Sequence, residues 1–119
     1  MIRNKSGVWG EIYSARYLRD RGYEILKSNY SCRFGEIDII ASKKGRISFV
    51  EVKSRNISTS LRPMEAVDEV KQKKMLLTAQ YYASYTKFSG EMQFDVCEVY
   101  LNDDNTLSKI NYIENAFNG

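Results

Sequence analysis

The sequence contains no histidine, and this absence removes several kinds of catalytic chemistry at once. A serine or cysteine nucleophile activated by histidine, a histidine general base and a histidine-ligated zinc ion are all excluded. Any catalysis by this chain must therefore depend on carboxylates, lysines, hydroxyls, thiols or a metal ion bound by oxygen atoms.

Cysteine and proline are scarce. The two cysteines, Cys32 and Cys97, lie far apart, and neither belongs to a pair with metal-ligand spacing. We interpret them as free, buried and unreactive thiols rather than as a redox pair. The only proline, Pro63, follows a polar segment, 54–62, which we expect to be a loop, and precedes a helical pattern. Proline is favoured at the first position of a helix, so we expect Pro63 to open one.

Long apolar runs are also missing, so no segment can cross a bilayer, and the first residues lack a signal-peptide core. We therefore expect a cytoplasmic protein that does not associate with membranes. Residues 1–119 are enough for one domain, and a hydrophobic content of 43% favours a globular fold over disorder. The net charge of +3 permits nucleic-acid binding but does not by itself indicate it.

The hydrophobic pattern predicts the element order α-β-β-β-α-β-β. A first helix can begin at Ser6 and end at Gly22, residue types that suit a helix start and stop. The remaining elements are strands at 23–33, 35–41, 46–53, 92–101 and 107–113, a helix at 63–85, and a short terminal helix. The turn at 42–45 should pair the second and third strands as an antiparallel hairpin. This order predicts an α/β sandwich around a mixed sheet.

The second helix carries two lysines within an otherwise apolar stripe of residues, Met64, Val67, Val70, Lys71, Lys74, Leu77 and Tyr81. Either these lysines contact phosphate or support a charged site, or their stems pack while their ammonium groups reach water. The pattern leaves both interpretations open. Three tyrosines cluster at Tyr81, Tyr82 and Tyr85. We interpret them as core or interface residues, because a base-stacking surface would need them exposed beside basic residues.

Charged residues occupy the two strands that should be the most buried. Because side chains alternate between the faces of a strand, Glu36 shares a face with Asp38, and Glu51 shares a face with Lys53. If the hairpin forms, Asp38 and Glu51 project to the same side. Two adjacent carboxylates are unfavourable unless one is protonated or a cation lies between them.

A bound metal ion would resolve this conflict. Asp38 and Glu51, with a strand carbonyl and waters, form an oxygen-rich site suited to Mg²⁺ or Mn²⁺. Lys53 beside the metal can stabilise negative charge on a phosphate or help to position the attacking water. Alternatively, the charges form an ion pair on a solvent-facing sheet. The pattern alone does not decide between these readings.

Asp38 followed by Glu51-Val52-Lys53 resembles the signature of PD-(D/E)XK nucleases. The surrounding segments resemble the YraN family of small bacterial proteins over nearly the whole chain. In order, they are WGEIYSARYLRDRGYEIL, NYSCRFGEIDIIA, FVEVKSR, AVDEVKQKKMLLTAQYY and QFDV. This family is similar to archaeal Holliday-junction resolvases and to other restriction-endonuclease-like folds.

The resemblance implies a restriction-endonuclease-like, three-layer α/β sandwich, in which helices flank a mixed central sheet with a core of four strands. It implies that Asp38, Glu51 and Lys53 are catalytic. It also implies that Glu11, Asp38, Glu51 and the main chain of Val52 hold Mg²⁺ or Mn²⁺, with Glu11 as an additional acid on the first helix.

Further matched positions suggest nucleic-acid contacts and supporting roles. Four basic residues are expected to contact the nucleic-acid backbone: Arg33, Arg55, Lys71 and Lys74. Glu36 is expected to support the site indirectly, for example by orienting Arg33. Asp95 is expected to be structural, as a partner for a helix lysine.

Three functions fit these features, in the following order. The first is a metal-dependent endonuclease or phosphodiesterase acting on DNA, with branched intermediates of repair or recombination as candidate substrates. The second is a non-catalytic module that has the nuclease fold and binds nucleic acid, DNA or RNA. The third is a protein-interaction scaffold. A homodimer is expected only by analogy with the resolvases.

Overall fold

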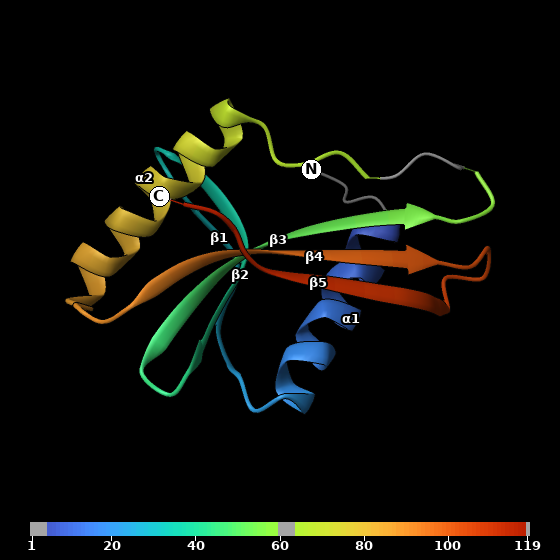
Figure 1. Ribbon diagram of the computed structural model, residues 1–119, viewed down its shortest axis with the longest axis horizontal. Coiled ribbons are helices and arrows are strands. Elements are labelled where there is room, and N and C mark those ends of the chain that lie inside the picture. The colour runs from blue at the N-terminus through green and yellow to red at the C-terminus, as the bar shows by residue number, and fades with distance from the viewer. Residues whose placement is uncertain (1–4, 60–63, 119) are drawn as a thin grey trace.

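The computed structural model describes residues 5–59 and 64–118, with seven elements in the predicted order (Figure 1). They are α1 (Lys5–Asp20), β1 (Glu24–Cys32), β2 (Gly35–Lys43), β3 (Arg46–Asn56), α2 (Glu69–Thr86), β4 (Met92–Leu101) and β5 (Leu107–Phe117). The strands form one sheet in chain order, one strand more than the core that the resemblance implies. Only β3 and β4 are parallel among these neighbours, so the sheet is mixed and the α/β prediction is confirmed.

The two helices cover opposite faces of this twisted sheet (Figure 1). Beneath α2, the core contains Ile40, Phe49, Met75, Tyr82 and Phe94. Beneath α1, it contains Ala15, Leu18, Ile39, Val50 and Cys97. Adjacent strand residues thus point into different cores, as strand alternation requires. The result is the predicted three-layer arrangement.

The hairpin between β2 and β3 forms where the sequence predicts it. Lys43 pairs with Arg46, and the two residues between them have positive φ angles, 51° at Lys44 and 78° at Gly45. Two consecutive left-handed residues suit a tight turn whose twist matches that of the strands. The turn fixes the register of the two strands that carry Asp38 and Glu51.

α1 also ends where expected, because Gly22 adopts a φ of 86° and donates its N–H to the carbonyl of Arg19. At its other end, α1 extends beyond the predicted cap to Lys5, which places Ser6 inside the helix. In the part of the chain that the structure describes, neither helix has the length and apolarity required to span a membrane.

The predicted start of the second helix is wrong. α2 begins at Glu69, and the Asp68 carboxylate caps it by accepting the Lys71 N–H at 2.8 Å. Residues 64–68 have no regular structure, and Pro63 lies outside the described residues. The expected loop at 54–62 begins later than predicted, because β3 continues through Asn56. Residues 60–62 of that segment are not described.

The apolar stripe predicted for this helix is wrong as well. Val70 is 67% exposed and Leu77 is 42% exposed, whereas the buried residues of α2 are Met75, Thr78, Ala79, Tyr82 and Ala83. This face is selected by packing: the Tyr82 ring meets those of Phe49 and Tyr30 edge-on, at 6.1 and 5.2 Å. The two lysines therefore do not lie in a buried stripe.

The terminal helix is replaced by strand, since β5 continues to Phe117. Phe117 pairs with Phe94 on β4, and their rings stack at 5.1 Å. A register shift near this point accommodates Asn115, whose N–H reaches the Asp95 carboxylate. These tertiary contacts outweigh the local helix propensity of the segment.

Candidate active site

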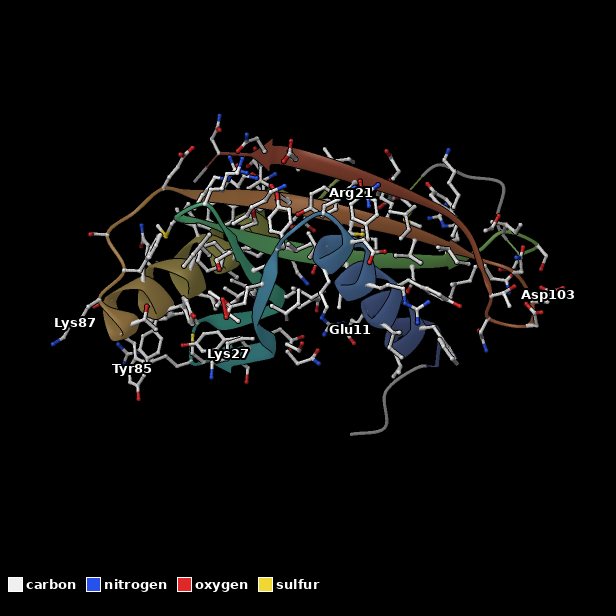
Figure 2. All side chains as sticks on the ribbon, turned by 90° about the horizontal axis from the view of Figure 1, so that it is seen from below. Glu11, Arg21, Lys27, Tyr85, Lys87 and Asp103 are labelled. Atoms are coloured by element: carbon white, nitrogen blue, oxygen red, sulfur yellow. The ribbon has the colours of Figure 1, made fainter. Side chains whose placement is uncertain are left out.

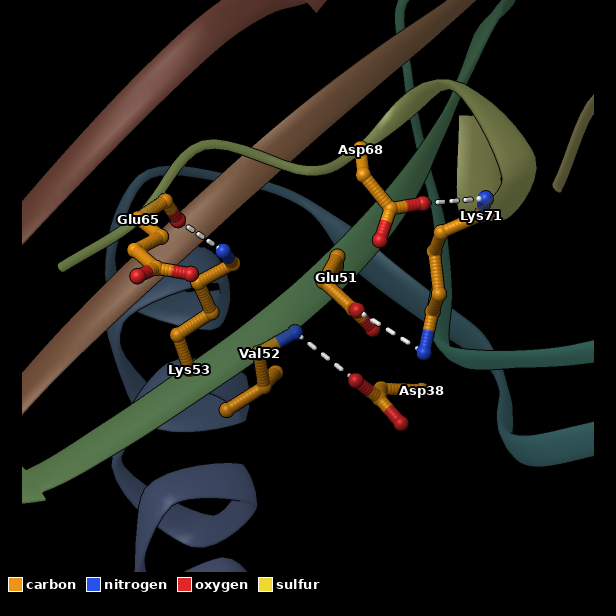
Figure 3. Close-up of polar contacts among 7 residues, drawn as sticks. All are labelled: Asp38, Glu51, Val52, Lys53, Glu65, Asp68 and Lys71. Atoms are coloured by element: carbon orange, nitrogen blue, oxygen red, sulfur yellow. Dashed lines mark hydrogen bonds and ion pairs between the residues drawn. The ribbon is translucent and has the colours of Figure 1, made fainter. Parts of the chain in front are cut away.

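β2 and β3 separate at Asp38. Their pairing ends at Ile39 and Val50, and beyond it the Asp38 Oδ2 atom accepts the Val52 N–H at 2.8 Å (Figure 3). The side chain therefore satisfies a main-chain donor at the point where the ladder ends. This bond holds the Asp38 carboxylate at the edge of β3.

The alternation predicted for β2 fails at the same residue. Ile37 lies in the core beneath α2, together with Ile40, whereas Ile39 lies in the core beneath α1. A strictly alternating strand would have placed Ile37 with Ile39. The prediction that Glu36 and Asp38 share a face of a regular strand therefore does not describe this irregular part of β2.

Asp38 and Glu51 interact directly. Glu51 is 9% exposed and lies on β3 beside the point where the strands separate. Burial, a hydrogen bond with Glu51 and the negative charge of Glu51 raise the pKa of Asp38 to about 8, and the Val52 N–H offsets only part of this. The structure thus brings together the two carboxylates that the sequence singled out.

Lys71 supplies a positive charge to this pair. Its Nζ atom lies 3.0 Å from Glu51 Oε2, and its side chain is 42% exposed (Figure 3). Burial lowers the pKa of Lys71, but the pairing with Glu51 and the nearby charge of Asp38 outweigh this effect and raise it. Of the interpretations considered for this lysine, electrostatic support of a charged site matches the contact.

Lys53 lies farther along β3, and its ammonium group points elsewhere. It donates a hydrogen bond to the main-chain carbonyl of Glu65, in the segment that leads into α2 (Figure 3). Lys53 is therefore close to the carboxylate pair along the strand, but its charged end is held by a different part of the chain.

Glu11 reaches the site from α1, the helix on the face of the sheet opposite to α2. The preceding residue, Gly10, packs so closely on β3 that an added Cβ would lie 2.8 Å from the Ser54 Cβ atom. Glu11, Asp38 and Ser54 line a small cavity of about 60 Å³. The charge of Glu11 also contributes to the raised pKa of Asp38, after burial and Glu51. The glycine thus allows α1 to bring a third carboxylate towards the site.

The donor set can be compared with what a divalent ion requires. Within residues 5–59 and 64–118, no three acidic or thiol side chains converge closely enough to enclose a metal ion by themselves. Mg²⁺ often binds through one or two carboxylates and completes its coordination with water and substrate phosphate. Asp38 and Glu51, two mutually repelling carboxylates at a strand edge, fit that kind of open site.

The basic residues expected to contact nucleic acid flank this pair. Arg33 is exposed beside Phe34, with its guanidinium 4.8 Å from the ring centroid. Lys74 is exposed on α2, and its Cβ would lie 3.4 Å from a Cβ added at Gly35. Arg55 lies near the other end of β3, where it lines a pocket with Lys53 and Ser54.

Glu36 is exposed, and its charge contributes to the raised pKa of Lys71, after the effects of burial, Glu51 and Asp38. It therefore acts on Lys71, whereas the contact given for Arg33 is with the Phe34 ring. The supporting role expected for Glu36 stays a prediction.

Comparison with known proteins identifies the family. The sequence model described as "Uncharacterised protein family UPF0102" matches residues 10–99, a range that contains the carboxylate pair. The chain belongs to the UPF0102 family. This confirms the family predicted from the resemblance to YraN proteins.

Relatives match along almost their whole length. A UPF0102 protein of Caldanaerobacter subterraneus subsp. tengcongensis is 47% identical over 93% of this chain and 93% of its own. One of Clostridium acetobutylicum is 45% identical over 98% and 96%. One of Caldicellulosiruptor saccharolyticus is 41% identical over 98% and 100%. The similarity therefore extends over the whole fold.

In this UPF0102 chain, Asp95 is buried apart from the candidate site. It accepts hydrogen bonds from the Tyr112 hydroxyl at 2.5 Å, the Gln93 amide at 3.1 Å and the Asn115 N–H at 3.0 Å. The expected partner, a helix lysine, is wrong, because these donors come from β4 and β5. The contacts themselves are those of a structural residue.

Two aromatic residues, Tyr81 and Tyr85, are exposed where a core or interface position was predicted. Only Tyr82 of the three clustered tyrosines is buried, whereas Tyr81 is 39% exposed and Tyr85 is 78% exposed. A signal was present, because Lys74, Tyr81 and Tyr85 have spacings that place them on one side of a helix. The wrong apolar stripe assigned that side to the core.

Proposed function

We propose that this UPF0102 protein is a metal-dependent endonuclease that acts on DNA, with Asp38 and Glu51 as ligands of Mg²⁺ or Mn²⁺. One observation carries the proposal: the two carboxylates contact each other at the point where β2 and β3 separate. Buried like charges are unfavourable unless a proton or a cation accompanies them. A divalent cation would compensate both carboxylates.

The remaining residues have roles that follow from their positions. When bound, the metal would activate a water molecule and neutralise charge on the reacting phosphate. Glu11 and the main chain of Val52 would complete the protein's side of the site. Lys53, once released from the Glu65 carbonyl, would stabilise negative charge on the phosphate. Lys71 neutralises Glu51 and would share it with the metal.

DNA is the proposed substrate because basic side chains lie on both sides of the carboxylate pair. Arg33 and Lys74 lie towards the β1–β2 turn, and Arg55 lies towards the other end of β3. Contacts to phosphates give binding that is independent of sequence and falls steeply with salt. We include branched DNA of repair or recombination among the substrates, and a homodimer that would present two such sites to two strands.

A cleavage assay tests this proposal. Wild-type protein is incubated with single-stranded, duplex, flapped and four-way-junction DNA, with Mg²⁺, Mn²⁺ or EDTA. Asp38→Asn and Lys53→Met are compared with Asp20→Asn and Lys109→Met, which alter exposed residues outside the site. We expect metal-dependent cleavage by the wild type and both controls, and loss of at least about 10²-fold in both site variants. Equal cleavage by Asp38→Asn would contradict the proposal.

A non-catalytic nucleic-acid-binding module is the second candidate. The observation that favours it is the position of Lys53, whose ammonium group is bound to the Glu65 carbonyl rather than directed at the carboxylates. Salt-dependent DNA binding without cleavage of any substrate would support this function. Absence of binding to both nucleic acid and divalent metal would instead favour a protein-interaction scaffold.

A further inference from the structure

A groove separates the β1–β2 turn from the second half of α2. It has a volume of about 620 Å³ and is lined by Tyr30, Ser31, Cys32, Arg33, Tyr81 and Tyr85. Tyr85 projects from α2 into solvent (Figure 2), and its side chain is the most exposed of the large hydrophobic residues described. This groove is not part of the carboxylate site.

The aromatic rings in the groove offer faces to a planar ligand. Tyr81 and Tyr85 stack with their centroids 6.4 Å apart and their planes 16° apart. Phe34, which follows Arg33 in the chain, meets the Tyr81 ring edge-on at 6.0 Å and 61°. Exposed, nearly parallel rings suit nucleobases, which stack on aromatic side chains regardless of base identity.

The charge of the groove is suited to a phosphate backbone. Arg33 is exposed on one wall, and no acidic residue is among the six residues that line the groove. On the opposite wall, no acidic residue follows Glu69 in α2. Planar faces beside an exposed arginine match the combination of stacking and electrostatic contact found in proteins that bind single strands.

The groove and the carboxylate site both lie along α2, the groove at Tyr81 and Tyr85 and the carboxylate site at Lys71. Lys71, Lys74, Tyr81 and Tyr85 follow one another at spacings that place them on one side of the helix. At 1.5 Å per residue, Tyr81 and Tyr85 lie about 15 and 21 Å from Lys71, which pairs with Glu51. At about 3.4 Å per nucleotide, this distance corresponds to about four to six nucleotides.

We propose that this groove binds the unpaired bases of a single-stranded DNA segment, which stack on Tyr81 and Tyr85 while Arg33 contacts the backbone. The inference rests on the proposed function, because it assigns the endonuclease a preferred substrate. That substrate is DNA with a single-stranded segment a few nucleotides from the scissile bond, such as a flap.

Fluorescence anisotropy in EDTA tests the groove without cleavage. A labelled oligothymidylate and a labelled blunt duplex are titrated with wild-type protein, Tyr81→Ala, Tyr85→Ala and Tyr85→Phe. Tyr17→Ala is the matched control, since Tyr17 also stacks on a tyrosine, Tyr112, at 5.4 Å and lies beneath an arginine. Because α1 covers the other face of the sheet, this control lies outside the groove.

We expect Tyr81→Ala and Tyr85→Ala each to weaken oligothymidylate binding by about 5- to 150-fold, as loss of one stacked base predicts. Duplex binding should change by less than about twofold, because paired bases cannot enter the groove. Tyr85→Phe, which keeps the ring, and Tyr17→Ala should bind both probes like the wild type. Unchanged affinity in the two alanine variants, or equal loss for both probes, would overturn the proposal.

Two further readouts separate this inference from the proposed nuclease activity. Light scattering shows whether the alanine variants change oligomeric mass; a change would identify the groove as an interface between copies and overturn the proposal. If the wild type cleaves DNA but the tyrosine variants bind oligothymidylate normally, only the groove proposal fails. If the wild type cleaves nothing but the variants selectively lose oligothymidylate binding, the groove proposal stands and the nuclease proposal fails.

Discussion

Two aspartates, Asp38 on β2 and Asp95 on β4, stand in similar apolar sequence surroundings but in opposite electrostatic surroundings. Asp95 accepts three hydrogen bonds, from a hydroxyl, an amide and a main-chain N–H. Asp38 accepts one main-chain N–H and faces Glu51, with Glu11 nearby. The difference distinguishes a carboxylate whose charge is satisfied by three donors from one whose ionisation is disfavoured by a neighbouring carboxylate, and we propose a metal-binding role only for the second.

The largest expected effect is on activity, in Asp38→Asn. This variant removes one proposed metal ligand while keeping the shape of the side chain and an oxygen for the Val52 N–H. We expect cleavage to fall by at least about 10²-fold, with no loss of stability at pH 8. Cleavage rates and urea unfolding of the same preparation check both parts. Unfolding of the variant at pH 8 would contradict the comparison, because Asp38 would then be structural.

The next effect is on stability, in Asp95→Asn. The side-chain amide of this variant carries N–H donors. They would face the three groups that donate hydrogen bonds to the Asp95 carboxylate in the wild type. We expect the free energy of unfolding to fall by about 2–3 kcal/mol, because at least one buried polar group loses its partner. Urea unfolding measures this change. Cleavage per folded molecule should be retained, and its loss in a stable variant would show that Asp95 belongs to the site.

The pH dependence of stability should distinguish the two aspartates in the metal-free protein. Because the pKa of Asp38 is about 8 in the folded protein and near 4 in the unfolded chain, the folded state retains a proton that the unfolded state loses. The contribution of Asp38 to the free energy of unfolding is therefore fully present below about pH 4 and decreases as the pH rises towards 8.

We expect Asp38→Asn to reduce the dependence of the free energy of unfolding on pH, and Asp95→Asn to leave it unchanged. Urea unfolding at a series of pH values measures both. Mn²⁺ should also stabilise the wild type more at pH 8 than at pH 5, since it competes with the proton. Identical slopes for the wild type and Asp38→Asn would contradict the assigned direction of the pKa shift.

The smallest effect is expected in Lys71→Met. The ion pair with Glu51 is partly exposed, so its loss should change the free energy of unfolding by at most about 1 kcal/mol. Affinity for Mn²⁺ should rise, because the ammonium group no longer competes for Glu51. Lys74→Met, which alters an exposed lysine one turn away, is the control and should leave Mn²⁺ affinity unchanged. Weaker Mn²⁺ binding in Lys71→Met would contradict the expected competition between Lys71 and the metal for Glu51.

Much of the fold could be predicted from local patterns. Backbone preferences that follow from residue type determine the tight turn at Lys44 and Gly45 and the end of α1 at Gly22. One error overlooks a local signal: the Asp68 carboxylate caps α2 through the nearby Lys71 N–H, later than Pro63 suggests. The other occurs where a distant contact decides, because Phe117 extends β5 by packing on Phe94. That partner cannot be identified from the neighbouring residues alone.

The candidate site was predictable in its residue types but only partly in its geometry. The hairpin register predicts that Asp38 and Glu51 lie close together, whereas the alternation expected for β2 fails at Asp38. The break in β2 at Asp38 could not be anticipated, because it depends on the bond from the Val52 N–H. The direction of Lys53 towards Glu65 likewise depends on a segment that was expected to be helical.

Isothermal titration of Mn²⁺ tests the central claim, that Asp38 and Glu51 form a metal site, most directly. The titration is carried out at pH 7 in two buffers of different ionisation enthalpy, which reveals how many protons binding releases. We predict that the wild type binds Mn²⁺ and releases most of one proton, because Asp38 must ionise to become a ligand. We predict that Asp95→Asn does the same and that Asp38→Asn loses both binding and release. No binding by the wild type, or equal binding by Asp38→Asn, would contradict the account.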